Sequence, residues 1–290
     1  MDSQLTDLYR KYLDNSLDRR GFLKKLVKLA GGSAAAVALI PILENKYGRA
    51  QIIPEDDARL NSGTIEYPAD NLKIRAYQAS LKGQTKRPGV IVIHENKGLQ
   101  PHIKDVTRRI ALEGFLALAP DALSPLSGTP ADINEARSNM RKLDPMTTVE
   151  NFIAAVKYLK THPLATGKVG CTGFCWGGAM TNRLAVLCPD LDAAVPFYGR
   201  QPSAEEVPRI NASLLCHYGE LDKRINAGIE IFEKALKAAS IDYTIFIYPG
   251  AKHAFFNDSN PDRYHRKAAE LAWKRTIAFL NEKLKPDGST

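Results

Sequence analysis

Past Gln51 the chain alternates short apolar runs with stretches whose apolar residues recur at helical spacing. Residues 90–93 are apolar without interruption, as expected for a strand that is buried on both faces. Residues 63–68 and 72–80 alternate apolar and polar side chains, which predicts an antiparallel pair at a sheet edge. Strands that alternate with helices predict an α/β fold with a mostly parallel central sheet and helices on both faces.

The same patterns place the remaining elements. Helices are expected at residues 102–114, 131–143, 147–162, 176–187, 226–239 and about 264–284, and strands at residues 88–94, 115–119, 168–174, 191–198, 212–218 and 243–248. Thr147 or Thr148 is the expected N-cap of its helix. Ligands of such sheets bind beyond the carboxyl ends of the strands, so candidate functional residues are sought there.

One such end carries a nucleophile motif. Residues 173–178 read Gly-Phe-Cys-Trp-Gly-Gly between an expected strand and an expected helix. This is the nucleophile-elbow pattern G-x-S-x-G with Cys175 in the serine position. The glycines permit a sharp turn in which larger side chains would clash. Cys175 is then expected at a helix N-terminus, where free amides and the helix dipole favour a thiolate.

A thiol nucleophile of this kind needs a base and an acid further along the chain. His253 follows the expected strand at residues 243–248, so it can reach the elbow. His217 is interpreted as a core histidine, and His265 as a surface residue on a helix. Asp222, which follows the strand at residues 212–218, is the expected acid, with Glu220 as the alternative.

The strand at residues 88–94 ends in a loop that contains Glu95 and Asn96. The backbone amides of Asn96 and Trp176 are the expected oxyanion hole. Glu95 is expected beside the thiol, where its carboxylate either keeps the thiol protonated or accepts the thiol proton. The alternative is a structural ion pair between Glu95 and Arg108 or Arg109.

The first fifty residues are typical of an export signal. Asp18-Arg19-Arg20-Gly21-Phe22-Leu23-Lys24-Lys25 precedes a weakly apolar run over residues 26–43. Paired arginines followed by Phe-Leu-Lys resemble a twin-arginine signal, although Asp18 stands where Ser or Thr is usual. Residues 1–50 are therefore expected to engage the twin-arginine export machinery, with cleavage after Ala50 and a periplasmic product. An uncleaved signal would anchor the protein at the inner membrane, and a helix packed on the body is the structural alternative.

Charge and cysteine content exclude other classes. The formal net charge is +8, but residues 1–50 hold nine basic and five acidic residues, so the remaining body is only moderately basic. That balance does not favour a nucleic-acid partner. The four cysteines show no zinc-ligand spacing, and the three other than Cys175 are interpreted as buried reduced thiols. Residues 51–290 are therefore expected to form one domain.

The body, over about residues 63–284, resembles the dienelactone hydrolase family of α/β-hydrolases. The resemblance lies in His94-Glu95, in residues 101–109, in Ala117-Leu118-Ala119-Pro120-Asp121 and in residues 173–178. It implies an α/β-hydrolase fold, a monomer, and no metal or organic cofactor. It also implies that Cys175, Asp222 and His253 form the catalytic triad and that Glu95 activates the thiol when substrate binds.

The chain departs from the family at the carboxylate clamp. The resemblance implies two arginines that hold a substrate carboxylate, one of them four residues after the catalytic histidine. That position is Asn257 here, and Arg137 and Arg141 are not clearly in register with the second arginine. Without a bidentate clamp, dienelactone itself is not the expected substrate.

These features together predict hydrolysis of a small ester or lactone through an acyl-enzyme on Cys175. A thioesterase with the same triad is one alternative. A non-hydrolytic periplasmic protein with a redox-active thiol, or a binding protein, is the other.

Overall fold

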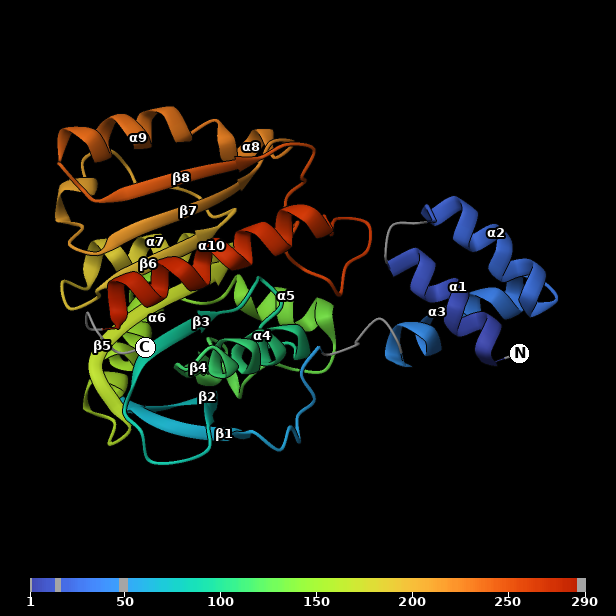
Figure 1. The fold of residues 1–290 in the computed structure, drawn as a ribbon, viewed down its shortest axis with the longest axis horizontal. Helices are drawn as coiled ribbons and strands as arrows, with labels where there is room; N and C mark the ends of the chain where they lie inside the picture. The colour runs from blue at the N-terminus through green and yellow to red at the C-terminus, as the bar shows by residue number, and fades with distance from the viewer. Residues whose placement is uncertain (1, 14–16, 47–51, 286–290) are drawn as a thin grey trace.

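A computed structural model describes residues 2–13, 17–46 and 52–285. Its centre is an eight-stranded sheet in the order β1-β2-β4-β3-β5-β6-β7-β8 (Figure 1). The strands are β1 (Leu60–Ala69), β2 (Leu72–Leu81), β3 (Arg87–Ile93), β4 (Leu116–Pro120), β5 (Ala165–Phe174), β6 (Ala193–Phe197), β7 (Ser213–Gly219) and β8 (Tyr243–Tyr248). The β1–β2 and β2–β4 pairs are antiparallel and the other five are parallel. The expected mostly parallel sheet, with an antiparallel pair at its edge, is confirmed.

Helices cover both faces of this sheet. The helices of the body are α4 (Pro101–Leu112), α5 (Ile133–Met140), α6 (Pro145–Thr161), α7 (Trp176–Leu187), α8 (Lys223–Asn226), α9 (Ile229–Ala238) and α10 (Arg266–Leu284). Apolar side chains of α6, α7 and α9 join one buried cluster, and those of α4 and α10 join another. The predicted arrangement of helices on both faces is therefore confirmed.

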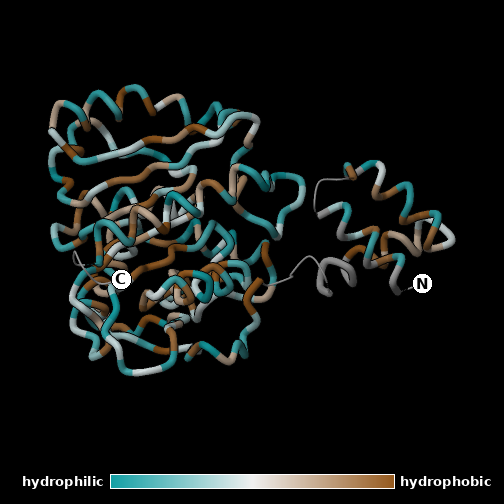
Figure 2. Tube along the Cα trace, viewed as in Figure 1, coloured by the Kyte–Doolittle hydropathy of each residue, from teal (hydrophilic) through white to brown (hydrophobic). Residues whose placement is uncertain are grey.

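The central strand β3 shows why the sheet is buried on both faces. All of its residues are buried. Val90 and Val92 pack into the cluster of α4 and α10, whereas Ile91 and Ile93 pack into the cluster of α6, α7 and α9. In Figure 2 much of the apolar chain, in brown, lies along the strands inside the body. A continuous apolar run is what two covered faces require.

The order of the strands also locates a binding crevice. From β3 the chain passes to β4 on one side and later to β5 on the other side. Ligands of open α/β sheets bind at the carboxyl ends of the strands where the order reverses in this way. Glu95 follows β3 and Cys175 follows β5, so the topology places both residues at this point.

Three details of the helices differ from the sequence-based prediction. The N-cap of α6 is Asp144, whose side chain accepts the Thr147 N–H, and not Thr147 or Thr148. The helix expected at residues 226–239 is α9, which begins only at Ile229 with Gly228 as its N-cap, and the short helix α8 before it was not predicted. His265 does not lie within a helix but caps α10, accepting the Ala268 N–H at 3.2 Å.

The N-terminal residues form the helices α1 (Asp2–Leu13), α2 (Arg19–Ala30) and α3 (Ser33–Lys46) (Figure 1). They share an apolar cluster of their own that includes Tyr9, Phe22 and Leu26. The Tyr12 hydroxyl lies 3.1 Å from Asp262 Oδ1 of the body. Among the described residues no helix combines the length and the apolar character needed to cross a membrane. The predicted cleavage after Ala50 falls outside the described residues.

Candidate active site

Cys175 lies in a tight turn between β5 and α7. Its φ of 58° and ψ of −111° lie outside the usual regions for a residue with a side chain, at a cost of about 1–3 kcal/mol. A Cβ on Gly173 would lie 2.2 Å from the Gly177 carbonyl oxygen, and a Cβ on Gly177 would lie 2.3 Å from the Ile93 carbonyl oxygen. Both glycines are therefore needed to bring α7 against β5 and β3. The turn places the thiol at the N-terminus of α7.

His253 and Asp222 lie beside this turn. His253, in the loop after β8, donates from Nδ1 to Oδ2 of Asp222, and its side chain hydrogen-bonds with that of Cys175. Asp222 is held by its own N–H, which donates to the Gly219 carbonyl at 3.0 Å between β7 and α8. The structure thus brings together the three residues that the sequence proposed as a triad.

The protonation of His253 follows from these neighbours. Burial alone would lower the pKa of His253. Its hydrogen bonds and charge interactions with Asp222 and Cys175 outweigh burial and raise the pKa to about 9. The ring therefore carries a proton at neutral pH.

Tyr198 fixes the other side of the imidazole, and no sequence motif marks it. Its ring packs edge-on against His253, with 5.1 Å between the ring centroids. Tyr198 follows β6 with a φ of 38°, and its N–H donates to the His217 carbonyl at 2.7 Å. Burial raises the pKa of Tyr198 well above its usual value, so its hydroxyl remains neutral. The only sequence signal was its place at a strand end.

Glu95 is held by Asn257. Asn257 Nδ2 donates to Glu95 Oε2 at 3.0 Å, and Lys97 Nζ lies 4.0 Å from the same oxygen. Asn257 is oriented in turn by Ser259, whose N–H donates to Asn257 Oδ1 at 3.0 Å. Glu95 Oε1 is buried and has no hydrogen-bond partner among residues 52–285. One carboxylate oxygen is therefore fixed, and the other can accept a proton.

The alternative pairing of Glu95 with Arg108 or Arg109 is not found. Arg109 contacts Asp105 and Asp258. Arg108 donates to the Ile53 carbonyl and to the Tyr77 hydroxyl. The carboxylates that Arg109 contacts belong to α4 and to the loop after β8.

The expected oxyanion amides belong to two segments, the loop after β3 and the start of α7. Asn96 is exposed directly after Glu95, and Trp176 is the first residue of α7, where amides have no carbonyl partner within the helix. His94 stacks on Trp176 with 5.4 Å between ring centroids. Its Nδ1–H donates to the Glu95 carbonyl at 2.6 Å, and its Nε2 accepts the Ala122 N–H at 3.1 Å. Burial lowers the pKa of His94, so this neutral ring orders the loop.

The other residues weighed at the sequence level lie elsewhere. His217 is a core histidine as predicted: its ring nitrogens lie 3.0 Å from the Thr276 hydroxyl and 2.9 Å from the Tyr248 hydroxyl. Burial lowers the pKa of His217 to about 3. Arg137 and Arg141 are exposed at α5. Glu220 accepts the N–H of Gly250 and does not replace Asp222. The three cysteines other than Cys175 are buried and free.

Comparison with known proteins agrees with this geometry. The model of the Dienelactone hydrolase family matches residues 74–284. A relative from Escherichia coli O157:H7, named "Putative carboxymethylenebutenolidase", is 32% identical over 247 residues, covering 80% of this chain and 90% of the relative. "Protein usf" from Aquifex pyrophilus is 36% identical over 231 residues, covering 76% and 98%.

A solved structure shows the same fold. The crystal structure of "Putative Dienelactone Hydrolase" from Klebsiella pneumoniae matches with a TM-score of 0.70 and 29% identity. The match covers 77% of this chain and 99% of the Klebsiella chain. The family match over residues 74–284 includes β3, the elbow and the loop after β8. The chain therefore belongs to the dienelactone hydrolase family and is a hydrolase of that type.

Proposed function

We propose that the protein hydrolyses a small ester or lactone with Cys175 as nucleophile, His253 as acid and base, and Asp222 as the orienting carboxylate. The observation that carries this proposal is the continuous contact from Cys175 through His253 to Asp222 at a nucleophile elbow. The raised pKa of His253 supports a thiolate–imidazolium pair as the resting state.

In the first step the Cys175 thiolate attacks the ester carbonyl, and the carbonyl electron pair moves onto oxygen. The amides of Asn96 and Trp176 donate to that oxyanion. Collapse breaks the bond to the alkoxy oxygen, which takes the proton of His253 and leaves as an alcohol. Neutral His253 then takes a proton from water as the water attacks the thioester, and the second collapse releases the acid and regenerates the thiolate.

Glu95 is proposed to assist the thiol. Glu95 would accept the thiol proton in molecules where Cys175 is protonated. Two observations support this role: Glu95 Oε1 has no hydrogen-bond partner among the described residues, and Asn257 holds the other carboxylate oxygen. The neutral amide of Asn257 adds no positive charge to the pocket, and Arg137 and Arg141 are exposed at α5. We therefore expect substrates without a carboxylate near the reacting carbonyl to be preferred.

Hydrolysis of short-chain p-nitrophenyl esters by the full chain tests this proposal. Replacement of the nucleophile in Cys175→Ala should lower kcat/KM by at least about 10³-fold, the usual effect of removing a triad member. Cys188→Ala is the matched control, because Cys188 is also free but lies in the buried core. Equal turnover by the wild type and Cys175→Ala would refute the proposal.

We further propose that residues 1–50 act as a twin-arginine export signal that delivers the protein to the periplasm. Asp18 is the N-cap of α2 and accepts the Gly21 N–H at 2.8 Å, a role that Ser and Thr also fill, so its departure from the usual residue is chemically mild. Replacing both Arg19 and Arg20 with Lys should leave the protein in the cytoplasm of a bacterial host. Lys24→Arg should not alter export, and periplasmic recovery of the double-lysine variant would contradict the proposal.

A further inference from the structure

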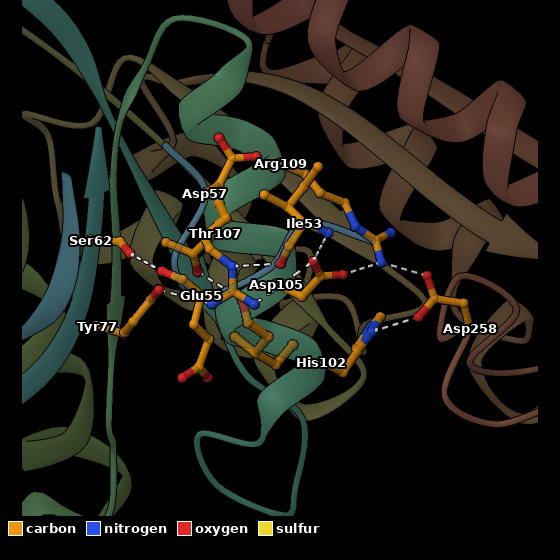
Figure 3. A network of polar contacts seen from close by, with 12 residues as sticks. Ile53, Glu55, Asp57, Ser62, Tyr77, His102, Asp105, Thr107, Arg109 and Asp258 are labelled. Atoms are coloured by element: carbon orange, nitrogen blue, oxygen red, sulfur yellow. Dashed lines mark hydrogen bonds and ion pairs between the residues drawn. The ribbon is translucent and has the colours of Figure 1, made fainter. Parts of the chain in front are cut away.

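Beside the loop after β8, which carries His253, lies a cluster of buried and partly buried charged groups that the proposed reaction does not use. Its members are Asp105 and Arg109 of α4, His102 one turn earlier, and Asp258 of the loop after β8 (Figure 3). In Figure 3 Arg109 lies between the two carboxylates, and His102 contacts Asp258 from another side. We refer to these four residues as the anchor cluster.

Asp258 connects the loop after β8 to helix α4. Arg109 Nη2 lies 2.6 Å from Asp258 Oδ2, and His102 Nδ1 lies 2.9 Å from Asp258 Oδ1. Burial would raise the pKa of Asp258, but His102 and Arg109 outweigh burial and lower the pKa to about 2. The Asp258 carboxylate is therefore charged throughout the working pH range, and the contact with Arg109 persists.

Arg109 is itself fixed from the other side. It contacts Asp105, whose second oxygen accepts the Ile53 N–H at 2.8 Å. Arg108 donates to the Ile53 carbonyl at 2.8 Å, so both backbone groups of Ile53 are bound by α4. The segment that enters the body thus holds Asp105, and Asp105 and Asp258 together hold the guanidinium.

The loop that Asp258 holds carries both His253 and Asn257. His253 precedes Asp258 by five positions and contacts Cys175, and Asn257 is adjacent to Asp258 and holds Glu95. Between them Ala254 has a φ of 65°, a strained value for a residue with a side chain. Strained loops persist only where their surroundings hold them, and the anchor cluster supplies a buried ionic contact immediately after Asn257.

We propose that Arg109 and Asp258 are positioning residues that hold His253 against Cys175 and Asn257 against Glu95. Neither residue touches the reacting atoms; each acts through the backbone of the loop. Removal of the Arg109 charge takes away the cation that lies between the Asp105 and Asp258 carboxylates. The repulsion between the two carboxylates is then no longer offset by Arg109, which displaces the loop. The consequence for hydrolysis depends on the proposed function, whereas the consequence for the thiol does not.

Alkylation of Cys175 by iodoacetamide therefore provides the primary measurement. Its rate is followed from pH 5 to 9 by mass spectrometry of the Cys175 peptide in the full chain. For Arg109→Gln and Asp258→Asn we expect alkylation at pH 7 to slow by about threefold or more, because an imidazolium that moves away no longer favours the thiolate. The midpoint of the pH profile should move upward, and Arg109→Lys should lie between the wild type and Arg109→Gln. Arg183→Gln, which removes an ion pair between α7 and Glu206, should match the wild type.

Ester hydrolysis by the same variants gives a second measurement, with circular dichroism to establish that each is folded. We expect kcat to fall about tenfold with little change in KM, since the loop positions reacting groups and does not bind substrate. If Arg109→Gln and Asp258→Asn alter the alkylation profile but the wild type hydrolyses no ester, the positioning role is supported and the proposed function is refuted. Folded Arg109→Gln and Asp258→Asn variants with wild-type alkylation profiles would overturn the positioning role, whether or not esters are hydrolysed.

Discussion

The hydrogen bond between Asn257 and Glu95 joins two buried side chains that are 162 positions apart. Asn257 is 4% exposed and Glu95 is 8% exposed, so neither group can exchange this partner for bulk water. The amide is a neutral donor, and it satisfies one oxygen of the carboxylate without neutralising the charge. We therefore expect a substitution at Asn257 to act first on the Glu95 carboxylate.

Asn257→Asp should destabilise the fold in a pH-dependent manner. The substitution places a carboxylate at hydrogen-bond distance from Glu95 and removes the donor, which should cost about 2–3 kcal/mol at pH 7. Protonation of one carboxyl at about pH 5 restores a donor and should recover part of that loss. Urea unfolding at the two pH values measures the difference. Asn257→Leu, which adds no charge, is the comparison, and a penalty for Asn257→Asp that is identical at both pH values would contradict this explanation.

At the scale of the elements, the sheet and the helix α7 after the elbow were predicted from the local pattern of apolar residues and glycines in the sequence. The ranges of α7 and β8 were predicted without error, because apolar runs, glycines and a following proline mark their ends. The break between α8 and α9 was not predicted. A Cβ on Gly228 would lie 2.6 Å from the Gln201 side chain, so this break lies against a residue of another segment. The Asp144 cap was missed although Asp precedes Pro145, a helix-start signal present in the sequence.

The glycines of the elbow should be intolerant of even one methyl group. Gly177→Ala would place Cβ 2.3 Å from the Ile93 carbonyl oxygen and 2.5 Å from that of His94, both of which are backbone atoms that cannot rotate away. We expect a loss of several kcal/mol of stability, on the scale of overpacked core sites, together with lost turnover. Gly63→Ala is the matched control, because a Cβ there meets no atom within 4 Å. Thermal unfolding measures the midpoint of each variant. An equal decrease in the midpoints of Gly177→Ala and Gly63→Ala would refute the explanation by close backbone approach.

At the scale of the whole molecule, the order of Cys175, Asp222 and His253 along the chain was enough to name residues that the structure brings together. Their catalytic roles remain predictions. The contacts of Asp258 with Arg109, 149 positions away, carry no sequence signal, because a buried ion pair depends on which loops the fold brings side by side. The pairing of Asn257 with Glu95 was missed for the same reason. The sequence pattern was sufficient to propose the triad, whereas the residues that hold Glu95 and Asp258 in place became visible only in the structure.

The charge on His253 links this site to the stability of the entire body. Its pKa is about 9 in the folded chain and about 6.5 when unfolded, so the folded state binds the proton more tightly. The contribution of this protonation to the free energy of unfolding is therefore complete below about pH 6.5, and it is lost as the pH rises through about 9. The unfolding free energy of the wild type minus that of His253→Gln should shrink from pH 6 to pH 10, by on the order of 2 kcal/mol. Effects common to both proteins cancel in this difference.

Urea unfolding at pH 6, 8 and 10 measures that difference. Repeating the pair of measurements in a Cys175→Ala background removes one of the two side chains that raise the pKa of His253, so the decrease should be smaller there. A difference that stays constant over this pH range in both backgrounds would mean that His253 is not protonated in the folded chain at neutral pH. The thiolate–imidazolium resting state would then have to be replaced by a neutral thiol–imidazole pair, in which Glu95 or His253 removes the thiol proton only after the substrate has bound.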